Sequence, residues 1–351
     1  MNNRDGTYDR PYLVVNSAFH VTVSIGFGLT AAIALARTIN SFFYEGKRDV
    51  VENSVIRRVA IDLAFILGYA CMGTALLAQA GVQDATSLLF SFLMLIVIMA
   101  IAAPLVVLDQ TSNANDMDLR RALLGPGSST DMGLHLFGTD KYGRDHFSRV
   151  ILGSRISLTV GFIAVGISLL IGIPVGAFAG YYGGRLDQFL TWAMSVLWSI
   201  PTLLLVIALT FVLGKGIVQV FIAVGLTMWV EVARVIRGQF LGEKSKEYVE
   251  AAKVLGFSTT HIIFKEILPN TWGPLVVICA TNFASALLIE SGLSFLGIGA
   301  QPPVPSWGGM IREYYPYLIT GKAYLSLIPG GLIALSVLSL NTLSTVWGER
   351  S

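Results

Sequence analysis

The sequence predicts an all-α fold, a polytopic bundle of helices that cross a lipid bilayer. The first observation is composition: 54% of the 351 residues are hydrophobic and 13% are charged, whereas soluble domains carry about a quarter charged residues. The second is a mean hydropathy of +0.68. The third is a series of apolar runs of the roughly 20 residues that a spanning helix needs. A net charge of +2 gives no indication of nucleic acid as a partner.

The apolar runs predict eight spanning helices. The clearest run, 87–108, contains no charged residue, and the run 156–180 is rich in glycine, which permits close helix approach in lipid. Pro174 and Pro201 lie inside runs, where prolines often mark kinks. The first run lacks the cleavage pattern of a signal peptide, so we interpret it as a retained helix, with an interfacial helix as the alternative. The candidate spans are 13–36, 59–80, 87–108, 156–180, 188–212, 217–236, 273–297 and 325–347.

The distribution of lysine and arginine predicts which side of the membrane each connection faces. The stretch 234–265 holds six basic residues, and short basic loops stay in the cytoplasm. Counting outward from it places 109–155, 213–216 and 298–324 outside, and 181–187 and both termini inside. The basic residues within 37–58 then fall outside, so either downstream signals override them or the first segment does not simply span.

The most informative cytoplasmic stretch is 239–270. Residues 243–255 predict a short helix with Tyr248, Ala251, Ala252 and Leu255 on one face, and a glycine that ends it. Ser258 is a candidate N-cap for a second amphipathic piece, which we expect the proline at position 269 to break. Two short helices that meet at a glycine would suit transmission of force from a soluble partner, and a loop lying on headgroups is the alternative.

This stretch resembles the EAA motif of type I ABC importer permeases, in which the segment docks on the ATPase subunit. The family consensus places isoleucine two residues before the leucine, where this chain has Glu266, with the isoleucine adjacent to the leucine instead. The resemblance implies that six residues couple the chain to the ATPase: Glu250, Ala251, Ala252, Gly256, Leu268 and Pro269.

Two further stretches resemble the "C" permeases of dipeptide, oligopeptide and nickel importers. The first is 135–145, HLFGTDKYGRD, and the second runs from 290 through 303 to Trp307-Gly308. The likeness covers about 109–350 and implies a type I transmembrane fold with six core helices plus two extra N-terminal helices. We therefore expect an N-terminal extension at 1–80, a first core helix and extracytoplasmic segment at 81–155, and the permease domain at 156–351.

The resemblance implies a permease subunit of an ATP-driven importer in the cytoplasmic, or inner, membrane. Its implied partners are the lipid bilayer, a homologous second permease, two cytoplasmic ABC ATPase subunits and an extracytoplasmic solute-binding protein. Peptides are the expected substrate, with nickel or a chelated metal as the second choice. The alternative is a self-sufficient secondary transporter or channel, which would predict inverted internal repeats that the sequence does not show.

Enzymatic chemistry is not expected of this chain. Lys215 and Lys322 follow glycines but lack the other residues of a phosphate-binding loop, and the scattered histidines predict no metal site. No cofactor is expected. Glu290, inside a span, is either a hydrogen-bonded structural residue or a pathway or gating residue. Glu231 and Arg234 predict an interfacial ion pair. Trp307, in the proline-rich outer loop, is a candidate for docking the binding protein or for anchoring the loop to headgroups.

Overall fold

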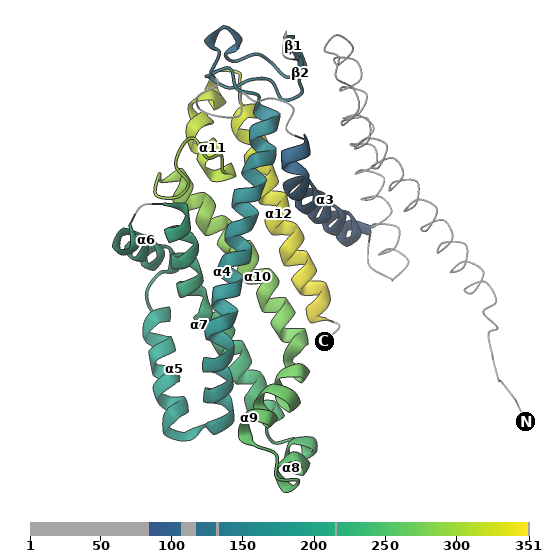
Figure 1. Cartoon of the computed structure of the whole chain (residues 1–351), viewed down its shortest axis with the longest axis vertical. Helices are drawn as coiled ribbons and strands as arrows, with labels where there is room; N and C mark the ends of the chain where they lie inside the picture. Colours follow the sequence, from purple (N-terminus) through teal and green to yellow (C-terminus); the bar gives the residue numbers. More distant parts are fainter. Residues whose placement is uncertain (1–83, 107–116, 131–132, 215, 350–351) are drawn as a thin grey trace, which may run out of the picture. The chain divides into compact units, whose positions relative to one another are not determined.

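The structure is a computed structural model that describes residues 84–106, 117–130, 133–214 and 216–349 (Figure 1). The chain divides into two units, Met1–Leu76 and Leu77–Ser351, and every described residue belongs to the second. The predicted spans 13–36 and 59–80, and with them the N-terminal extension, lie outside the described residues. The domain boundary expected between residues 155 and 156 falls inside the helix α4 (His146–Tyr182).

The described part is a helix bundle with one small β-hairpin. In the hairpin, Ser128 pairs with His135 in antiparallel register. The elements are α3 (Asp84–Val106), η3 (Leu119–Arg121), β1 (Ser128–Thr130), β2 (Gly133–His135), α4 (His146–Tyr182), α5 (Gly184–Trp198), α6 (Thr202–Leu213), α7 (Ile217–Glu243), α8 (Glu247–Val254), α9 (Thr259–His261), η4 (Ile262–Ile267), η5 (Leu268–Thr271), α10 (Trp272–Phe295), α11 (Trp307–Tyr314), η6 (Tyr315–Ile319) and α12 (Tyr324–Gly348).

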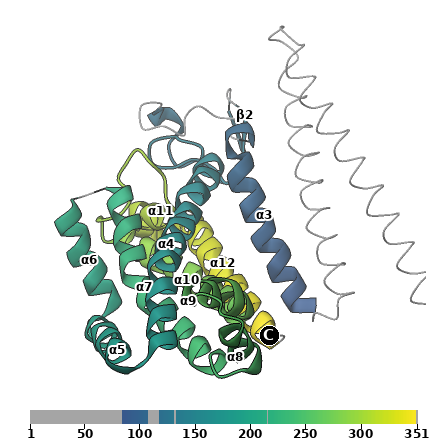
Figure 2. The same ribbon diagram turned by 60° about the horizontal axis from the view of Figure 1, so that its bottom comes forward.

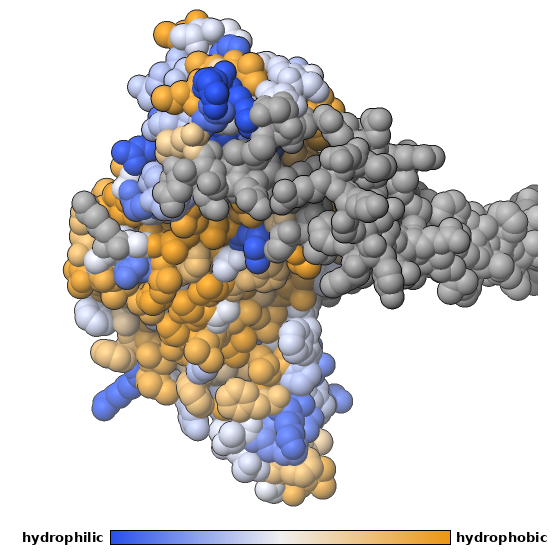
Figure 3. Space-filling model, turned by 45° about the horizontal axis from the view of Figure 1, so that its top comes forward, coloured by the Kyte–Doolittle hydropathy of each residue, from blue (hydrophilic) through white to orange (hydrophobic). Residues whose placement is uncertain are grey.

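The helices confirm a membrane bundle. Among the described helices, four are long and apolar enough to cross a bilayer: α4, α7, the continuous run 259–295 that ends with α10, and α12. The bent pair α5–α6 makes a fifth if it counts as one span, and α3 adds a shorter apolar stretch, Leu88–Ile101. A broad hydrophobic band crosses the middle of the face in Figure 3, with hydrophilic residues more frequent toward both ends.

The two ends of the bundle hold the segments that the charge pattern assigns to opposite sides of the membrane. The β-hairpin and α11 lie at the top of Figure 1, and α8 and α9 lie at the bottom, which comes forward in Figure 2. The helix α4 has 37 residues, about 55 Å at the helical rise, so it is longer than the hydrocarbon layer. Its first residues therefore belong to the upper end, which we call the outer end; the end with α8 is called the cytoplasmic end.

The span predicted at 188–212 is not one straight helix. The chain forms two helices there, α5 and α6, whose axes differ by 88°. Pro201 lies directly before α6, and a proline offers no amide to continue the hydrogen bonding of the preceding helix. By contrast, α4 runs through Pro174 as one helix.

Glycines on α4 bring α4 and α7 into direct backbone contact. A Cβ at Gly176 would lie 2.4 Å from the carbonyl oxygen of Ala233, and one at Gly172 would lie 2.7 Å from that of Trp229. Gly180 is similarly close to α7, and Gly161 meets Phe283 of α10. The predicted role of the glycine-rich run is therefore confirmed at these positions. A Cβ at Gly166 would meet no atom within 4 Å.

Candidate functional site

The candidate coupling segment is the stretch 247–269, which the resemblance singled out. Its first helix, α8, ends at Val254, and Gly256 follows with a φ of +79°, a left-handed conformation that glycine adopts without steric cost. The Ser258 hydroxyl then accepts a hydrogen bond from the amide of His261 at 3.3 Å. The predicted turn and N-cap are thus both present.

One face of α8 packs against the transmembrane helices. Val249 and Ala252 are buried in a cluster with Phe240 of α7, Ile263 of η4 and Leu275 of α10. The predicted apolar face was partly wrong, because Ala251 and Leu255 point to solvent. The buried face is instead set by Val249 and Ala252, which are three residues apart and therefore neighbours on the helix surface.

The opposite side of the segment is an exposed apolar knob, defined here as Val254, Leu255 and Phe257. Their exposed fractions are 88%, 72% and 44%, and the carboxylate of Glu250 is exposed beside them. Exposed apolar residues that cluster on a surface are typical of interaction sites. Sequence reasoning missed Val254 and Phe257 because their exposure depends on where the helix ends.

The predicted break at Pro269 is wrong as well. The chain continues from α9 through a π-helical turn, η4, and a 3-10 turn, η5, directly into α10. Changes of hydrogen-bond register of this kind absorb a missing amide without stopping the helix. Leu268 is half-buried and packs against the cluster that contains Val249 and Phe240, whereas Pro269 is exposed.

Glu290 lies fully buried between α4, α10 and the outer loop. Its carboxylate accepts hydrogen bonds from Ser157 of α4 at 3.3 Å and from Ser294 at 2.7 Å. The Ser157 hydroxyl also accepts from the amide of Trp307 at 3.4 Å. These contacts are the hydrogen bonds between helices that a structural role for Glu290 requires. A pathway or gating role for Glu290 stays a prediction.

Trp307 is inside the subunit rather than on its rim. It is 1% exposed, and its indole N–H donates to the carbonyl of Val150 at 3.0 Å. It packs with Leu158 of α4 and Leu287 of α10. In this position Trp307 holds the outer loop against the helices, so any effect on docking would pass through the shape of that loop.

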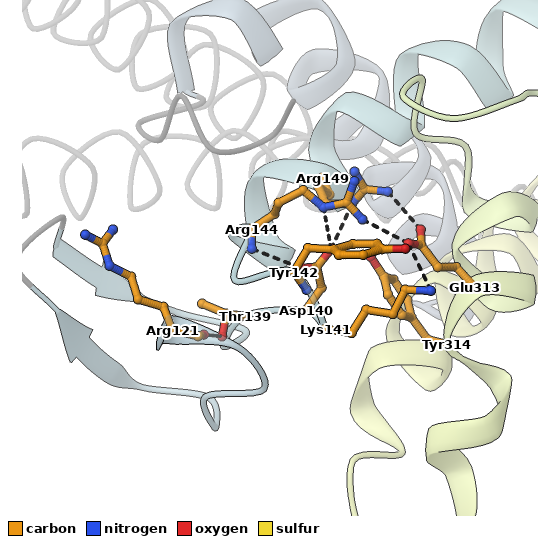
Figure 4. Close-up of polar contacts among 9 residues, drawn as sticks. All are labelled: Arg121, Thr139, Asp140, Lys141, Tyr142, Arg144, Arg149, Glu313 and Tyr314. Atoms are coloured by element: carbon orange, nitrogen blue, oxygen red, sulfur yellow. Dashed lines mark hydrogen bonds and ion pairs between the residues drawn. The ribbon is translucent and has the colours of Figure 1, made fainter. Parts of the chain in front are cut away.

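The outer end also carries a cluster of acidic and basic side chains and one tyrosine, which the sequence did not single out as a site (Figure 4). We call it the outer ion cluster and define it as Asp140, Arg144, Arg149, Glu313 and Tyr314. Arg144 donates to Asp140 at 2.6 Å and to Glu313 at 2.9 Å, while Arg149 donates to Glu313 at 3.2 Å. The Tyr314 hydroxyl donates to Asp140 at 2.8 Å.

The outer ion cluster joins the segment before α4, the first turn of α4 and α11. Asp140 and Tyr314 are completely buried. Burial raises the pKa of Tyr314 well above its ordinary value of 10, and the carboxylates of Asp140 and Glu313 act in the same direction against the two arginines. Burial would lower the pKa of Arg144, but Asp140, Tyr314 and Glu313 outweigh it, so this pKa is raised. At neutral pH Tyr314 therefore stays protonated and Arg144 stays charged.

The comparison with protein families decides what this architecture is. Residues 172–350, which include the coupling segment and Glu290, match the family model described as "Binding-protein-dependent transport system inner membrane component". The chain belongs to this family. Membership confirms the predicted membrane transport permease and its multi-pass location in the inner membrane.

Curated relatives agree with that assignment. The chain is 43% identical over 209 residues to a dipeptide transport system permease protein of Bacillus subtilis, covering 60% of this chain and 65%, just under two thirds, of that relative. It is 37% identical over 249 residues to an oligopeptide transport system permease protein of the same organism, covering 71% and 79%. A di/tripeptide transport system permease protein of Pseudomonas aeruginosa is 37% identical, covering 71% and 82%.

Among solved structures, the chain is similar to an inward-facing form of the MetNI methionine ABC transporter, with 20% identity and a TM-score of 0.47. The similarity covers 57% of this chain and 94% of that one.

Proposed function

We propose that this chain is a permease subunit of an ABC importer for peptides. It would form the translocation path with a homologous second permease, take peptides from an extracytoplasmic binding protein, and use ATP hydrolysed by two separate ATPase subunits. The observation that carries the proposal is the exposed apolar knob on α8, in a chain that belongs to a binding-protein-dependent transport family. An apolar surface at the cytoplasmic end, outside the membrane band, fits a protein partner.

The coupling role divides among the six residues that the sequence named. Glu250 and Ala251 are exposed and would touch the ATPase directly, together with Val254 and Leu255. Ala252 and Leu268 pack inward and would pass force to α7 and α10. Gly256 would set the turn, and Pro269 the exit into α10. Closure of the ATPase dimer would then displace α8 and open the cavity outward.

Peptides are the proposed substrate because the relatives carry dipeptide and oligopeptide transport in their names. Nickel or a chelated metal stays the second candidate. Uptake of labelled peptides by cells or proteoliposomes that hold the full complex tests the substrate class. Uptake that persists without the ATPase subunits would contradict the importer and favour the secondary transporter.

The coupling proposal is tested by Glu250→Lys and Gly256→Leu. Both variants should insert into the membrane but lose transport-coupled ATP hydrolysis, because one inverts the charge at the contact and the other forces a side chain into left-handed backbone. The matched control is Glu349→Lys, which inverts an exposed carboxylate after α12. Full transport by either test variant at normal complex levels would contradict the assignment.

Docking of a binding protein on the outer loop is tested at an exposed position, because removal of the buried Trp307 would also disturb packing. Val304 is 43% exposed in the proline-rich part of that loop. Val304→Asp should weaken stimulation of ATPase activity by loaded binding protein and leave basal ATPase activity intact. Thr320→Asp, at another exposed site of the outer end, is the control. If loaded binding protein stimulates the ATPase activity of both variants equally across a full titration, the loop only anchors the chain to headgroups.

A further inference from the structure

The broken span α5–α6 is attached to α7 in two different ways. Beyond the bend, α6 packs through apolar residues, and its Val206 lies in a cluster with Val220 and Val224 of α7. Before the bend, α5 buries a single residue, Met194, against Val230 of α7. Leu197 of α5 is partly buried in the same cluster, with Trp229 of α7 and Val175 of α4. Two further contacts of α5 with α7 are polar.

The first polar contact is a forked ion pair near the start of α5. The guanidinium of Arg237 donates to both carboxylate oxygens of Asp187, through Nε to Oδ1 and through Nη2 to Oδ2, the latter at 2.7 Å. The Thr191 hydroxyl donates to the same carboxylate at 3.2 Å. A two-point contact of this kind fixes direction as well as distance.

The second polar contact is at the other end of α5. The guanidinium of Arg234 lies 4.0 Å from the ring centroid of Trp198, the last residue of α5, and donates to the hydroxyl of Ser195 at 3.1 Å. A cation suits this place, because the last carbonyls of a helix carry partial negative charge. The ion pair predicted between Arg234 and Glu231 does not form.

These two arginines extend from the same part of α7 that carries the coupling segment. Arg234 and Arg237 are three residues apart and therefore share a helix face. Phe240, one turn further, packs on Val249 of α8. The Tyr248 hydroxyl donates to Glu243 at 2.8 Å, at the end of α7. A continuous set of contacts thus runs from α8 through α7 to both ends of α5.

The free side of α5 has no partner among the described residues. Phe189 and Trp192 are 61% and 62% exposed. A helix with one buried residue has little apolar packing to hold it in place. The two arginines therefore supply the directional contacts between α5 and α7.

We propose that Asp187, Arg234 and Arg237 are positioning residues that make α5 follow α7 when the coupling segment is displaced. This inference rests on the proposed function of α8. The two-point contacts transmit motion in direction, which the non-directional apolar contacts of Met194 and Leu197 would not do. The bend at Pro201 lets α5 move while α6 stays packed on the outer half of α7.

The test measures movement of α5 in the complete complex with its ATPase subunits. Spin labels are placed at Phe189→Cys on α5 and Ile319→Cys at the outer end, which are exposed by 61% and 92%, after Cys71→Ser and Cys279→Ser. The distance between the labels is measured without nucleotide and after trapping with ATP and vanadate. The variants are Asp187→Asn, Arg237→Gln and the exchange Asp187→Arg with Arg237→Asp. Arg185→Gln, at an exposed residue of the same helix, is the control.

We expect a distance shift on trapping in the unchanged protein and in Arg185→Gln, loss of the shift in both single variants, and its return in the exchange variant. A purely structural ion pair would alter complex levels and leave the shift in the assembled fraction. A shift retained in assembled Asp187→Asn, or no shift in a complex that imports peptide, would overturn this inference but not the proposed function. Absence of ATP-dependent peptide uptake by the unchanged complex would instead contradict the proposed function.

Discussion

The outer and cytoplasmic ends of this protein use charge and apolar surface in opposite ways. At the outer end, charged side chains are buried: Asp140, Arg144 and Arg149 are at most 3% exposed. At the cytoplasmic end, apolar side chains are exposed, with Val254 at the end of α8 and Leu255 directly after it. Neither arrangement follows the usual partition between a polar surface and an apolar interior.

The difference indicates where stability and function are located. Buried ions are held by one another, so removal of one leaves an uncompensated charge in a region of low dielectric. Exposed apolar residues contribute little to the fold and are available to a partner. Substitutions in the outer ion cluster should therefore affect folding, whereas substitutions in the apolar knob should affect association. The predictions below test this contrast, from the largest expected effect on stability to the smallest.

Removal of a carboxylate from the outer ion cluster should have the largest effect. Asp140→Ala leaves Arg144 buried with one carboxylate fewer and frees the Tyr314 hydroxyl. We expect a loss of about 3–5 kcal/mol in the free energy of unfolding, as for other broken buried ion pairs. Thermal unfolding of the purified complex measures it, with Arg120→Ala, whose side chain is 91% exposed, as the control. Equal melting temperatures for the two variants would contradict the contrast.

Loss of the tyrosine hydroxyl from the same cluster should have a smaller effect. Tyr314→Phe removes one hydrogen bond to a charged group, worth about 1.5–3 kcal/mol. The effect depends on pH: because the pKa of Tyr314 is raised in the folded state, its contribution is complete below the unfolded pKa of about 10 and decreases as the pH rises above it.

Melting temperatures of Tyr314→Phe and the unchanged protein should therefore differ most below pH 9, and the difference should decrease as the pH rises above 10. A difference that widens above pH 10 would show that the folded state does not favour the protonated hydroxyl. The comparison between the two proteins removes the contribution of other groups that titrate in this range.

Loss of the cap at the start of the long helical run should be a local effect. Ser258→Ala removes the hydroxyl that accepts from the His261 amide, at a cost of about 1 kcal/mol. Hydrogen exchange should become faster in 259–262 and remain unchanged in α4. Ser245→Ala, which removes an exposed hydroxyl that donates to the carbonyl of Gly242 at the end of α7, should leave exchange in 259–262 as it was.

Substitution in the apolar knob should hardly change stability. Leu255→Ser, at a residue 72% exposed, should alter the free energy of unfolding by less than about 0.5 kcal/mol. Association with the ATPase subunit should nevertheless weaken, which co-purification and titration of the ATPase measure. A destabilised but fully associated variant would reverse the contrast between the two ends.

Local sequence signals determined the helical elements and several of their ends. Apolar runs gave α3, α4, α7, α10 and α12 to within a few residues at most ends, because burial in lipid demands a minimum apolar length whatever the neighbours are. Gly256 and Ser258 marked a turn and a cap, since left-handed backbone and N-caps depend on one residue and its immediate amides. Family motifs indicated the coupling segment and the class of transporter.

Tertiary structure alone decided which charges are buried together and how the broken span is held. Asp140 and Glu313 are far apart in sequence, and both pair with Arg144 only because α11 packs near the start of α4. The ion pair of Asp187 with Arg237 likewise needs α5 to lie against α7 after the bend at Pro201. Such contacts depend on packing between distant segments, whereas turns, caps and spans depend on residues that are neighbours in the chain.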